Sequence, residues 1–258
     1  MPELPEAETI ARSLRPFLAG RTIVSAAFLA KRVSSDDPAR LAGRPILGVE
    51  RYGKQLSIAL DRGFIHVKLG MTGALLVNRE PGPHTRAVLE LDNGGRLLYD
   101  DIRQFGSLRL TDAPPAGLGP DPLEIDAAEF ATRLQARRGA LKPVLLNQAF
   151  LRGLGNIYVD EALHRAGFHP LTRAERVKAG RARELHGVIV QLLEEAIAHR
   201  GSSISDYVDA AGERGNFQNL HRVYGKEGEP CVQCGEPIRR IVVAQRGTHL
   251  CPGCQARR

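Results

Sequence analysis

Residues 111–123, TDAPPAGLGPDPL, divide the chain into two parts with different hydrophobic patterns. Proline and glycine are concentrated here, which is typical of a connection between domains. Before this stretch short β-rich runs alternate with turns, and after it apolar residues recur at helical spacing. The chain has 258 residues, more than one average domain. We therefore expect an α+β protein with several domains.

The part before residue 111 predicts one helix followed by a β-sandwich or barrel. Apolar residues recur at helical spacing from 6 to 18, and Gly20 suits the end of that helix. Short β-rich runs follow, separated by turn sequences such as DRG and DNGG. They cover residues 22–29, 46–52, 55–60, 64–68, 74–77, 87–91, 96–99 and 107–110. The helix would pack on the sheet and hold the first residues of the chain over it.

The part after residue 123 is helical up to its last segment. Helical patterns cover residues 127–137, 142–149, 157–166, 174–176 and 182–199. The polar segment 201–225 contains glycine, and we expect it to be mobile. We predict domains at 1–112, 126–224 and 225–258, with a linker at 113–125.

The stretch GLGN at 153–156 interrupts the helical pattern. Its two glycines allow the backbone to approach a ligand closely. Asn156 can cap the next helix, whose N-terminus attracts anions. A helix, a tight turn and a second helix that binds phosphate form a known grip on the DNA backbone. The same pattern also fits an ordinary helical hairpin.

All cysteines lie near the end of the chain and form the pattern C-x2-C-x16-C-x2-C: Cys231, Cys234, Cys251 and Cys254. This spacing is typical of four thiolates that bind one zinc ion, and two disulfides are the alternative that a reducing cytosol disfavours. Four thiolates complete the coordination of zinc, so the ion would be structural rather than catalytic. The residues between the two pairs predict a β-hairpin, with Gly247 near its turn and Arg246 at its tip.

The chain begins with MPELPE, which places a proline and a carboxylate at its start. Pro2 is small enough for Met1 to be removed, which would leave a secondary amine beside Glu3. An uncharged amine can attack a sugar carbon and form an iminium, while the carboxylate moves the protons. The same residues also suit an ordinary helix start, where proline and acidic side chains are favoured.

The net charge of +7 and the pI of about 9.5 indicate a polyanionic partner, most often nucleic acid. A basic protein without such a partner has the same composition. No apolar run approaches the ~18 residues of a membrane span, and no signal peptide is visible. We therefore expect a protein of the cytoplasm that has no membrane partner.

The motifs of the whole chain, taken together and in order, resemble the formamidopyrimidine-DNA glycosylase family. This family is the 8-oxoguanine glycosylase branch of the bacterial Fpg/Nei superfamily. The motifs are MPELPE at 1–6, Lys54 on a strand, LGMTG at 69–73, DIRQFG at 101–106, LGPDPL at 118–123, GLGNIYVDEAL at 153–163, CVQCGEPI at 231–238 and AQRGTHLCPGC at 244–254. The opening PELPE is more similar to the oxidised-purine branch than to the endonuclease VIII branch, which usually begins PEGPE.

The resemblance implies a bifunctional DNA glycosylase and AP lyase of base excision repair. It would remove formamidopyrimidines and 8-oxoguanine opposite cytosine through a Schiff base on the N-terminal proline, followed by β,δ-elimination. The implied fold is an N-terminal helix with a β-sandwich, a helix-two-turn-helix domain and a C-terminal β-hairpin zinc finger with one structural Zn²⁺. The implied partner is double-stranded DNA with oxidised bases or abasic sites, bound by a monomer in the bacterial cytoplasm, associated with the nucleoid.

The resemblance also assigns the residues of the catalytic domain at 1–112. Pro2 matches the nucleophile that attacks C1′, and Glu3 matches the acid and base that protonates the sugar ring oxygen. Glu6 matches a supporting carboxylate at the helix start. Lys54 matches a lysine that contacts phosphate near the lesion, and we count it among the catalytic residues.

Other residues are assigned to DNA binding by the same resemblance. Met71, Arg103 and Phe105 match the trio that fills the space left by the flipped base. Asn156 and Arg246 match phosphate ligands of the helix-two-turn-helix motif and the zinc finger. The segment 201–225 matches the mobile loop that caps the lesion. Considered singly, Met71 and Phe105 also suit a hydrophobic core, and Lys54 and Arg246 also suit a solvated surface.

The chain departs from the family pattern at two places and leaves two alternatives open. Lys68 stands where the family often has histidine, and we still expect it to contact phosphate. The usual His-x-His reads His84-Thr85-Arg86, and we expect His84 to contact DNA.

Two alternative functions stay open. The chain could be an oxidised-pyrimidine glycosylase similar to endonuclease VIII, or a non-catalytic zinc-ribbon DNA-binding protein.

Overall fold

Helix α1, Leu4–Leu18, begins the first of two units into which the chain divides. The computed structural model describes residues 1–204 and 206–256. The N-terminal unit comprises Met1–Ala116 and His199–Gln218, and the C-terminal unit comprises Gly117–Ala198 and Asn219–Arg258. Within the described residues, no helix is both long enough and apolar enough to cross a bilayer.

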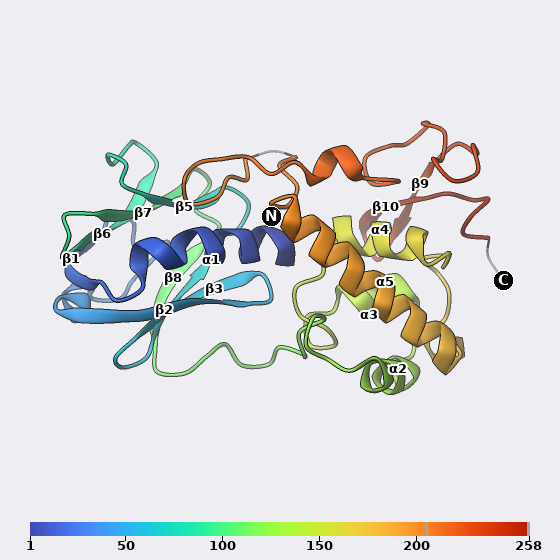
Figure 1. The fold of residues 1–258 in the computed structure, drawn as a ribbon, viewed down its shortest axis with the longest axis horizontal. Helices are drawn as coiled ribbons and strands as arrows, with labels where there is room; N and C mark the ends of the chain where they lie inside the picture. The colour runs from blue at the N-terminus through green and yellow to red at the C-terminus, as the bar shows by residue number, and fades with distance from the viewer. Residues whose placement is uncertain (205, 257–258) are drawn as a thin grey trace. The chain divides into compact units, whose positions relative to one another are not determined.

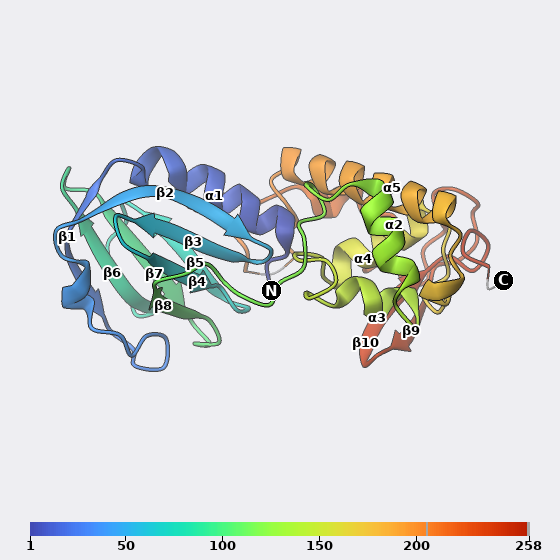
Figure 2. The same cartoon turned by 90° about the horizontal axis from the view of Figure 1, so that it is seen from below.

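The N-terminal unit contains the eight strands that the sequence predicts, in one antiparallel sheet ordered β5-β7-β6-β1-β2-β3-β4-β8. Strands β1 and β2 share few paired residues, Thr22 with Pro45 and Ile23 with Arg44, so the sheet bends there into two halves. Figure 2 shows the halves as two layers. The strands are β1 (Thr22–Phe28), β2 (Arg44–Tyr52), β3 (Gln55–Leu60), β4 (Phe64–Lys68), β5 (Gly73–Val77), β6 (Thr85–Leu91), β7 (Arg96–Asp101) and β8 (Ser107–Thr111).

The core of this unit lies between the two halves of the sheet and the apolar face of α1. Leu75 and Leu89 from one half and Leu56 and Ile65 from the other belong to a single buried cluster, which also includes Leu14 of α1. Alternating apolar residues on each strand fill this space, which is the arrangement of a β-sandwich. The predicted N-terminal helix and β-sandwich are therefore confirmed.

Helix α1 begins two residues earlier than its apolar pattern indicates. Glu3 is the N-cap, and reciprocal hydrogen bonds between Glu3 and Glu6 form a capping box that supports the first turn. Pro5 also lies in this first turn, where its missing N–H costs nothing. Gly20 follows the helix with a φ of 76°, a value that glycine adopts readily.

The segment 199–218 belongs to the N-terminal unit although it is distant in sequence. The amide of Ser202 donates to Glu6 Oε1 at 2.8 Å, and the amide of Ala210 donates to Ser13 Oγ at 3.2 Å. The Val77 amide of β5 donates to the Ala210 carbonyl at 3.1 Å. Backbone groups of this segment thus form hydrogen bonds to α1 and β5. Its mobility stays a prediction.

The C-terminal unit consists of helices followed by a two-stranded hairpin (Figure 1). Helix α2 packs against α5, and the Phe130 and His186 rings lie 5.1 Å apart between them. The chain also contains three short 3-10 helices in its described residues, which are η1 (Pro38–Leu41) in the N-terminal unit, η2 (Ala174–Arg176) and η3 (Phe217–Leu220). The other elements are α2 (Ala127–Gln135), α3 (Leu141–Leu146), α4 (Asn156–Arg165), α5 (Ala179–Ala198), β9 (Arg239–Val243) and β10 (Arg246–Leu250).

One local prediction for this unit is confirmed and one is wrong. The hairpin turn is formed by Ala244 and Gln245, whose φ angles are 49° and 60°, so Arg246 follows the turn directly and Gly247 lies near it, as predicted. Two positive φ angles suit the twist of a tight hairpin, although neither residue is glycine. Asn156 does not cap α4, because Gly155 occupies the N-cap and Asn156 is the first helical residue.

Candidate functional site

The start of α1 brings Pro2, Glu3 and Glu6 together. Pro2 is buried, and Glu3 and Glu6 are only 5% and 2% exposed. Glu6 Oε2 accepts from the Glu3 amide at 2.8 Å, and Glu6 Oε1 accepts from the Ser202 amide. At Gly201 a Cβ would lie 2.6 Å from Glu6 Oε1, so glycine is needed for this approach. Glu6 therefore fixes the backbone beside Pro2 and connects it to the segment 199–218.

Met71, Arg103 and Phe105 form a second cluster in the N-terminal unit. Arg103 Nη1 lies 3.4 Å from Met71 Sδ, and the Arg103 guanidinium lies 4.6 Å from the centre of the Phe105 ring. Met71 and Phe105 are 47% and 53% exposed. The structure thus places these three residues side by side on the surface, where an apolar core role is excluded for both Met71 and Phe105.

Three residues that we predict to contact DNA, Lys54, Lys68 and His84, lie at strand ends and turns of the same unit. Lys54 lies in the turn between β2 and β3, where Tyr52 pairs with Gln55, and not on a strand as predicted. Lys68 ends β4 and is exposed. His84 is exposed just before β6.

Arg86, which stands where the family usually has histidine, bonds to two backbone carbonyls. Its Nε donates to the Asp101 carbonyl at 3.0 Å, and its Nη1 donates to the Pro83 carbonyl at 3.2 Å. The first bond holds Asp101, the last residue of β7 before the loop with Arg103 and Phe105, and the second holds the turn before β6. The guanidinium therefore braces this loop.

In the C-terminal unit, Asn156 and Arg246 lie close to each other through Gly247. Asn156 Nδ2 donates to the Gly247 carbonyl at 2.9 Å, and Arg246 is the preceding residue, exposed at the start of β10. Lys142 Nζ donates to the same carbonyl at 3.1 Å. Asn156 is thus held beside the start of β10, which carries Arg246.

A buried ion pair supports this arrangement. Lys142 Nζ lies 2.6 Å from Asp160 Oδ1, and both side chains are fully buried. Asp160 Oδ2 also accepts from the His249 amide of β10 at 2.9 Å. Removing one partner of such a pair would leave an uncompensated charge in the interior. The pair therefore fixes the hairpin to α3 and α4.

The four cysteines fit one structural zinc ion. Their Sγ atoms all lie within 4.8 Å of one another, with Cys231 and Cys254 at 3.8 Å and Cys234 and Cys251 at 3.3 Å. Tetrahedral zinc with bonds of about 2.3 Å separates thiolates by about 3.8 Å, whereas a disulfide needs about 2.05 Å. Four thiolates leave no coordination position for a substrate.

Helix α4 contacts the zinc site through His164. The His164 Nε2 atom lies 3.4 Å from Cys231 Sγ. Burial raises the pKa of the Cys231 thiol, but hydrogen bonds from the Gln233 amide and the His164 ring outweigh this and lower the pKa to about 6. A low thiol pKa favours the thiolate that zinc requires.

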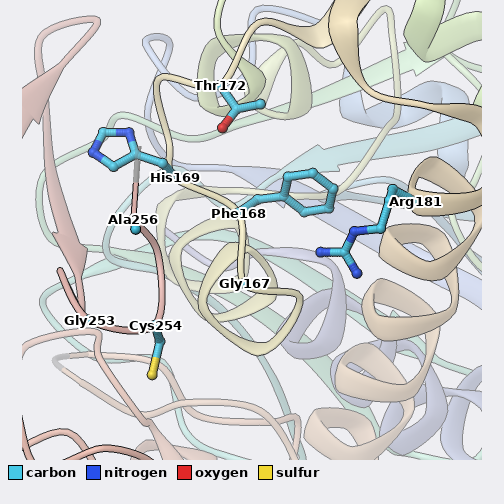
Figure 3. Close-up of a pocket in the computed structure, with 8 residues that line it drawn as sticks. All are labelled: Gly167, Phe168, His169, Thr172, Arg181, Gly253, Cys254 and Ala256. Atoms are coloured by element: carbon cyan, nitrogen blue, oxygen red, sulfur yellow. The ribbon is translucent and has the colours of Figure 1, made fainter. Parts of the chain in front are cut away.

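A cavity of about 280 Å³ lies beside the zinc site, and Figure 3 shows its lining. The Phe168 ring and the Arg181 guanidinium, 4.7 Å apart, turn toward each other there (Figure 3). Arg181 already donates to the Ala166 carbonyl at 2.7 Å. The described lining includes none of the residues predicted for catalysis, and its only cysteine is the zinc ligand Cys254.

Reasoning from the sequence missed the polar residues that hold these sites together. Asp101 lies in the motif DIRQFG and Lys142 lies in a predicted helix, but only the structure shows that both side chains are buried. The available signal was a charged residue within an apolar stretch, such as Asp160 in the helical stripe at 157–166. Such residues are buried only when they have partners.

Family models match most of the chain. The model of the formamidopyrimidine-DNA glycosylase N-terminal domain matches residues 1–108, and the model of the H2TH domain of the same glycosylases matches residues 118–208. A zinc finger found in FPG and IleRS matches residues 228–257.

Individual relatives agree with these matches. The formamidopyrimidine-DNA glycosylase of Solibacter usitatus is 51% identical over 266 residues, with both chains fully covered. The crystal structure of the MutM (FPG) protein from Thermus thermophilus is 40% identical with a TM-score of 0.90, again over the full length of both chains. A Lactococcus lactis FPG variant in complex with Fapy-dG containing DNA is 34% identical with a TM-score of 0.91, covering 99% of this chain and 100% of that one.

Proposed function

Because the chain belongs to the formamidopyrimidine-DNA glycosylase family, we propose that it excises oxidised purines from DNA in base excision repair. We also propose the AP lyase activity that is known for this family. The observation that carries the proposal is the start of α1, where Pro2 adjoins two buried carboxylates. Secondary support comes from the exposed trio of Met71, Arg103 and Phe105 in the same unit.

The proposed nucleophile is the amine of Pro2 after Met1 is removed. An ordinary α-amino group has a pKa of about 8, so a useful fraction is uncharged and nucleophilic near neutral pH. The lone pair of the Pro2 amine attacks C1′, the bond from C1′ to the base breaks, and the base leaves with the bonding electrons and takes up the proton that the Pro2 nitrogen releases. Glu3 protonates the sugar ring oxygen, and ring opening leaves a Schiff base between Pro2 and C1′.

The Schiff base accounts for the proposed strand cleavage. An iminium withdraws electrons and acidifies the neighbouring sugar proton, so β-elimination expels the 3′ phosphate. A δ-elimination then expels the 5′ phosphate and leaves a gap of one nucleotide. Glu6 supports these steps by holding the Glu3 backbone and the amide of Ser202, which lies in the segment 201–225 that we propose as the loop that caps the lesion.

The proposed substrate is double-stranded DNA with an oxidised base or an abasic site. Relatives from Lactococcus lactis have been solved with Fapy-dG containing DNA and with abasic-site containing DNA. An enzyme that acts on a base in a duplex must flip it and fill the gap, which we assign to the exposed trio. Lys54, Lys68, His84, Asn156 and Arg246 are the proposed DNA contacts.

Each predicted domain has a proposed task. Residues 1–112 perform the chemistry, residues 126–224 and 225–258 bind the DNA backbone, and residues 113–125 connect them. We expect a monomer in the bacterial cytoplasm, associated with nucleoid DNA. The bacterial origin of the similar proteins supports this location.

A panel of duplexes with defined lesions tests the proposed function. Each duplex carries one lesion, either 8-oxoguanine, a formamidopyrimidine or an oxidised pyrimidine, and released base and strand cleavage are measured separately. We expect release of the oxidised purines, with cleavage on both sides of the lesion. Faster release of oxidised pyrimidines would favour an activity similar to endonuclease VIII. Tight binding without base release would indicate a non-catalytic DNA-binding protein.

A further inference from the structure

The exposed trio comes from two separate loops that must act together. Met71 lies between β4 and β5, whereas Arg103 and Phe105 lie between β7 and β8. The loop backbones touch, since a Cβ at Gly70 would lie 2.7 Å from the Gly106 amide nitrogen. Something must hold the loops in register, because a wedge that enters stacked bases meets resistance.

Asp101 occupies the position where the loops meet, and it is fully buried. Its Oδ1 accepts from the Thr72 hydroxyl at 2.5 Å, and its Oδ2 accepts from the Gly106 amide at 2.9 Å. The Tyr99 hydroxyl also donates to Oδ2, at 3.3 Å. One carboxylate thus binds the residue after Met71 and the residue after Phe105.

Thr72 completes the connection. Its Oγ1 accepts from the Arg103 amide at 3.0 Å while its hydroxyl donates to Asp101. Arg103 is therefore joined through Thr72 to the same carboxylate that holds Gly106. At Gly106 a Cβ would lie 1.8 Å from the Tyr99 hydroxyl, so this packing admits only glycine.

We propose that Asp101 and Thr72 are positioning residues that join the two loops into one rigid wedge, so that Met71, Arg103 and Phe105 enter the DNA together. The proposal rests on the proposed function, because it assumes that the trio enters the duplex. Neither Asp101 nor Thr72 touches the reacting sugar in this scheme. They act through the three residues that they hold.

The decisive variants are Thr72→Val and Thr72→Ser. Valine keeps the shape of the side chain but removes the hydroxyl, so Arg103 and Asp101 lose their common partner. Serine keeps the hydroxyl and should restore the wedge. Asp101→Asn is a third variant, because its NH₂ group can no longer accept the bond that one carboxylate oxygen accepts.

Thr85→Val provides a matched control. Thr85 is a buried threonine of β6 whose hydroxyl donates to Asp100 at 2.7 Å, and it does not bind either wedge loop. The Thr85→Val substitution removes the same kind of hydrogen bond, from a threonine hydroxyl to a carboxylate, in the same sheet. Thermal unfolding of all the variants reports how much each loss affects stability.

Wedge insertion is measured with 2-aminopurine fluorescence next to a stable abasic analogue, which requires binding but no chemistry. We expect Thr72→Val and Asp101→Asn to slow insertion about tenfold and to narrow the preference for cytosine over adenine opposite the lesion. Thr72→Ser and Thr85→Val should match the wild type in both measurements. If Asp101→Asn does not fold, the two Thr72 variants decide the question.

Wild-type insertion rates and opposite-base preference in a folded Thr72→Val protein would overturn the proposal. Wild-type enzyme that inserts the wedge but releases no base would instead contradict the proposed glycosylase function. The two failures are therefore distinguishable.

Discussion

At the scale of single residues, Arg103 differs from its neighbours in the wedge because it carries hydrogen-bond donors. The guanidinium offers donors only, whereas Met71 and Phe105 are apolar. A base whose partner has been flipped out has an unpaired polar edge, and each unsatisfied group costs about 1–3 kcal/mol. Cytosine presents two acceptors on its pairing edge, and adenine presents one acceptor and one donor. Arg103 should therefore favour cytosine.

We predict that Arg103→Ala brings the preference for cytosine over adenine close to parity. Phe105→Ala should slow turnover equally opposite both bases, because a ring fills space without distinguishing their polar edges. Single-turnover kinetics on duplexes that differ only in the opposite base measure the ratio. An unchanged ratio in Arg103→Ala would exclude this role.

At the scale of elements, the position of α1 on the sheet depends on Glu8. Its carboxylate lies 3.0 Å from Arg51 Nε of β2 and 2.8 Å from Arg12 Nε of α1. Burial raises the pKa of Glu8, but the hydrogen bonds from Arg12 and Arg51 outweigh it and hold the pKa below its ordinary value. These contacts keep the start of α1, and with it Pro2, fixed on the sheet.

We predict that Glu8→Gln lowers the free energy of unfolding by about 2 kcal/mol at pH 7. A depressed carboxyl pKa contributes stability that is present above its ordinary value near 4.5 and is lost as the pH falls through the folded value. The difference between variant and wild type should therefore shrink at pH 3. Thermal or urea unfolding at both pH values measures it. A difference that is equally large at pH 3 would contradict the assignment.

The hairpin β9–β10 depends on the zinc site at one end and on α3 and α4 at the other. Zinc folds a short segment that buries little apolar surface. The Gly247 carbonyl then accepts from both Asn156 and Lys142. Loss of the metal should therefore displace Arg246 and remove a partner of Asn156 at the same time.

We predict that Cys231→Ser loses zinc and most of its DNA affinity together. Arg246→Ala should keep one zinc and weaken binding to all sequences, with a salt slope shallower by about 1. Metal analysis and binding titrations at several salt concentrations measure both effects. Full DNA affinity in a zinc-free protein would refute the structural role of the metal.

At the scale of the whole molecule, the regular elements were largely predictable from the sequence. The β-rich runs form strands because alternating apolar residues bury one face of the sheet. The cysteine spacing correctly predicted the cluster of four thiols. Ala244 and Gln245 were not predictable as a turn, because neither residue requires a positive φ. Here the pairing of β9 with β10 outweighs local preference.

The candidate site was predictable only in part. Pro2, Glu3 and the wedge trio stand in recognisable motifs, so their identities could be proposed from the sequence. The network around Asp101 could not, because Thr72 and Gly106 come from different loops. Membership of segment 199–218 in the N-terminal unit also depends on contacts between residues distant in sequence, such as Glu6 with Ser202.

Covalent trapping tests the central claim, that the N-terminal proline is the nucleophile. Borohydride reduces a Schiff base to a stable amine, so the enzyme should remain attached to lesion DNA. Mass spectrometry of the digested complex should place the sugar on the nitrogen of Pro2 in protein that lacks Met1, and Pro2→Gly should trap far less. Equal trapping by Pro2→Gly, or adducts on a lysine such as Lys54 in protein that retains Met1, would contradict the claim.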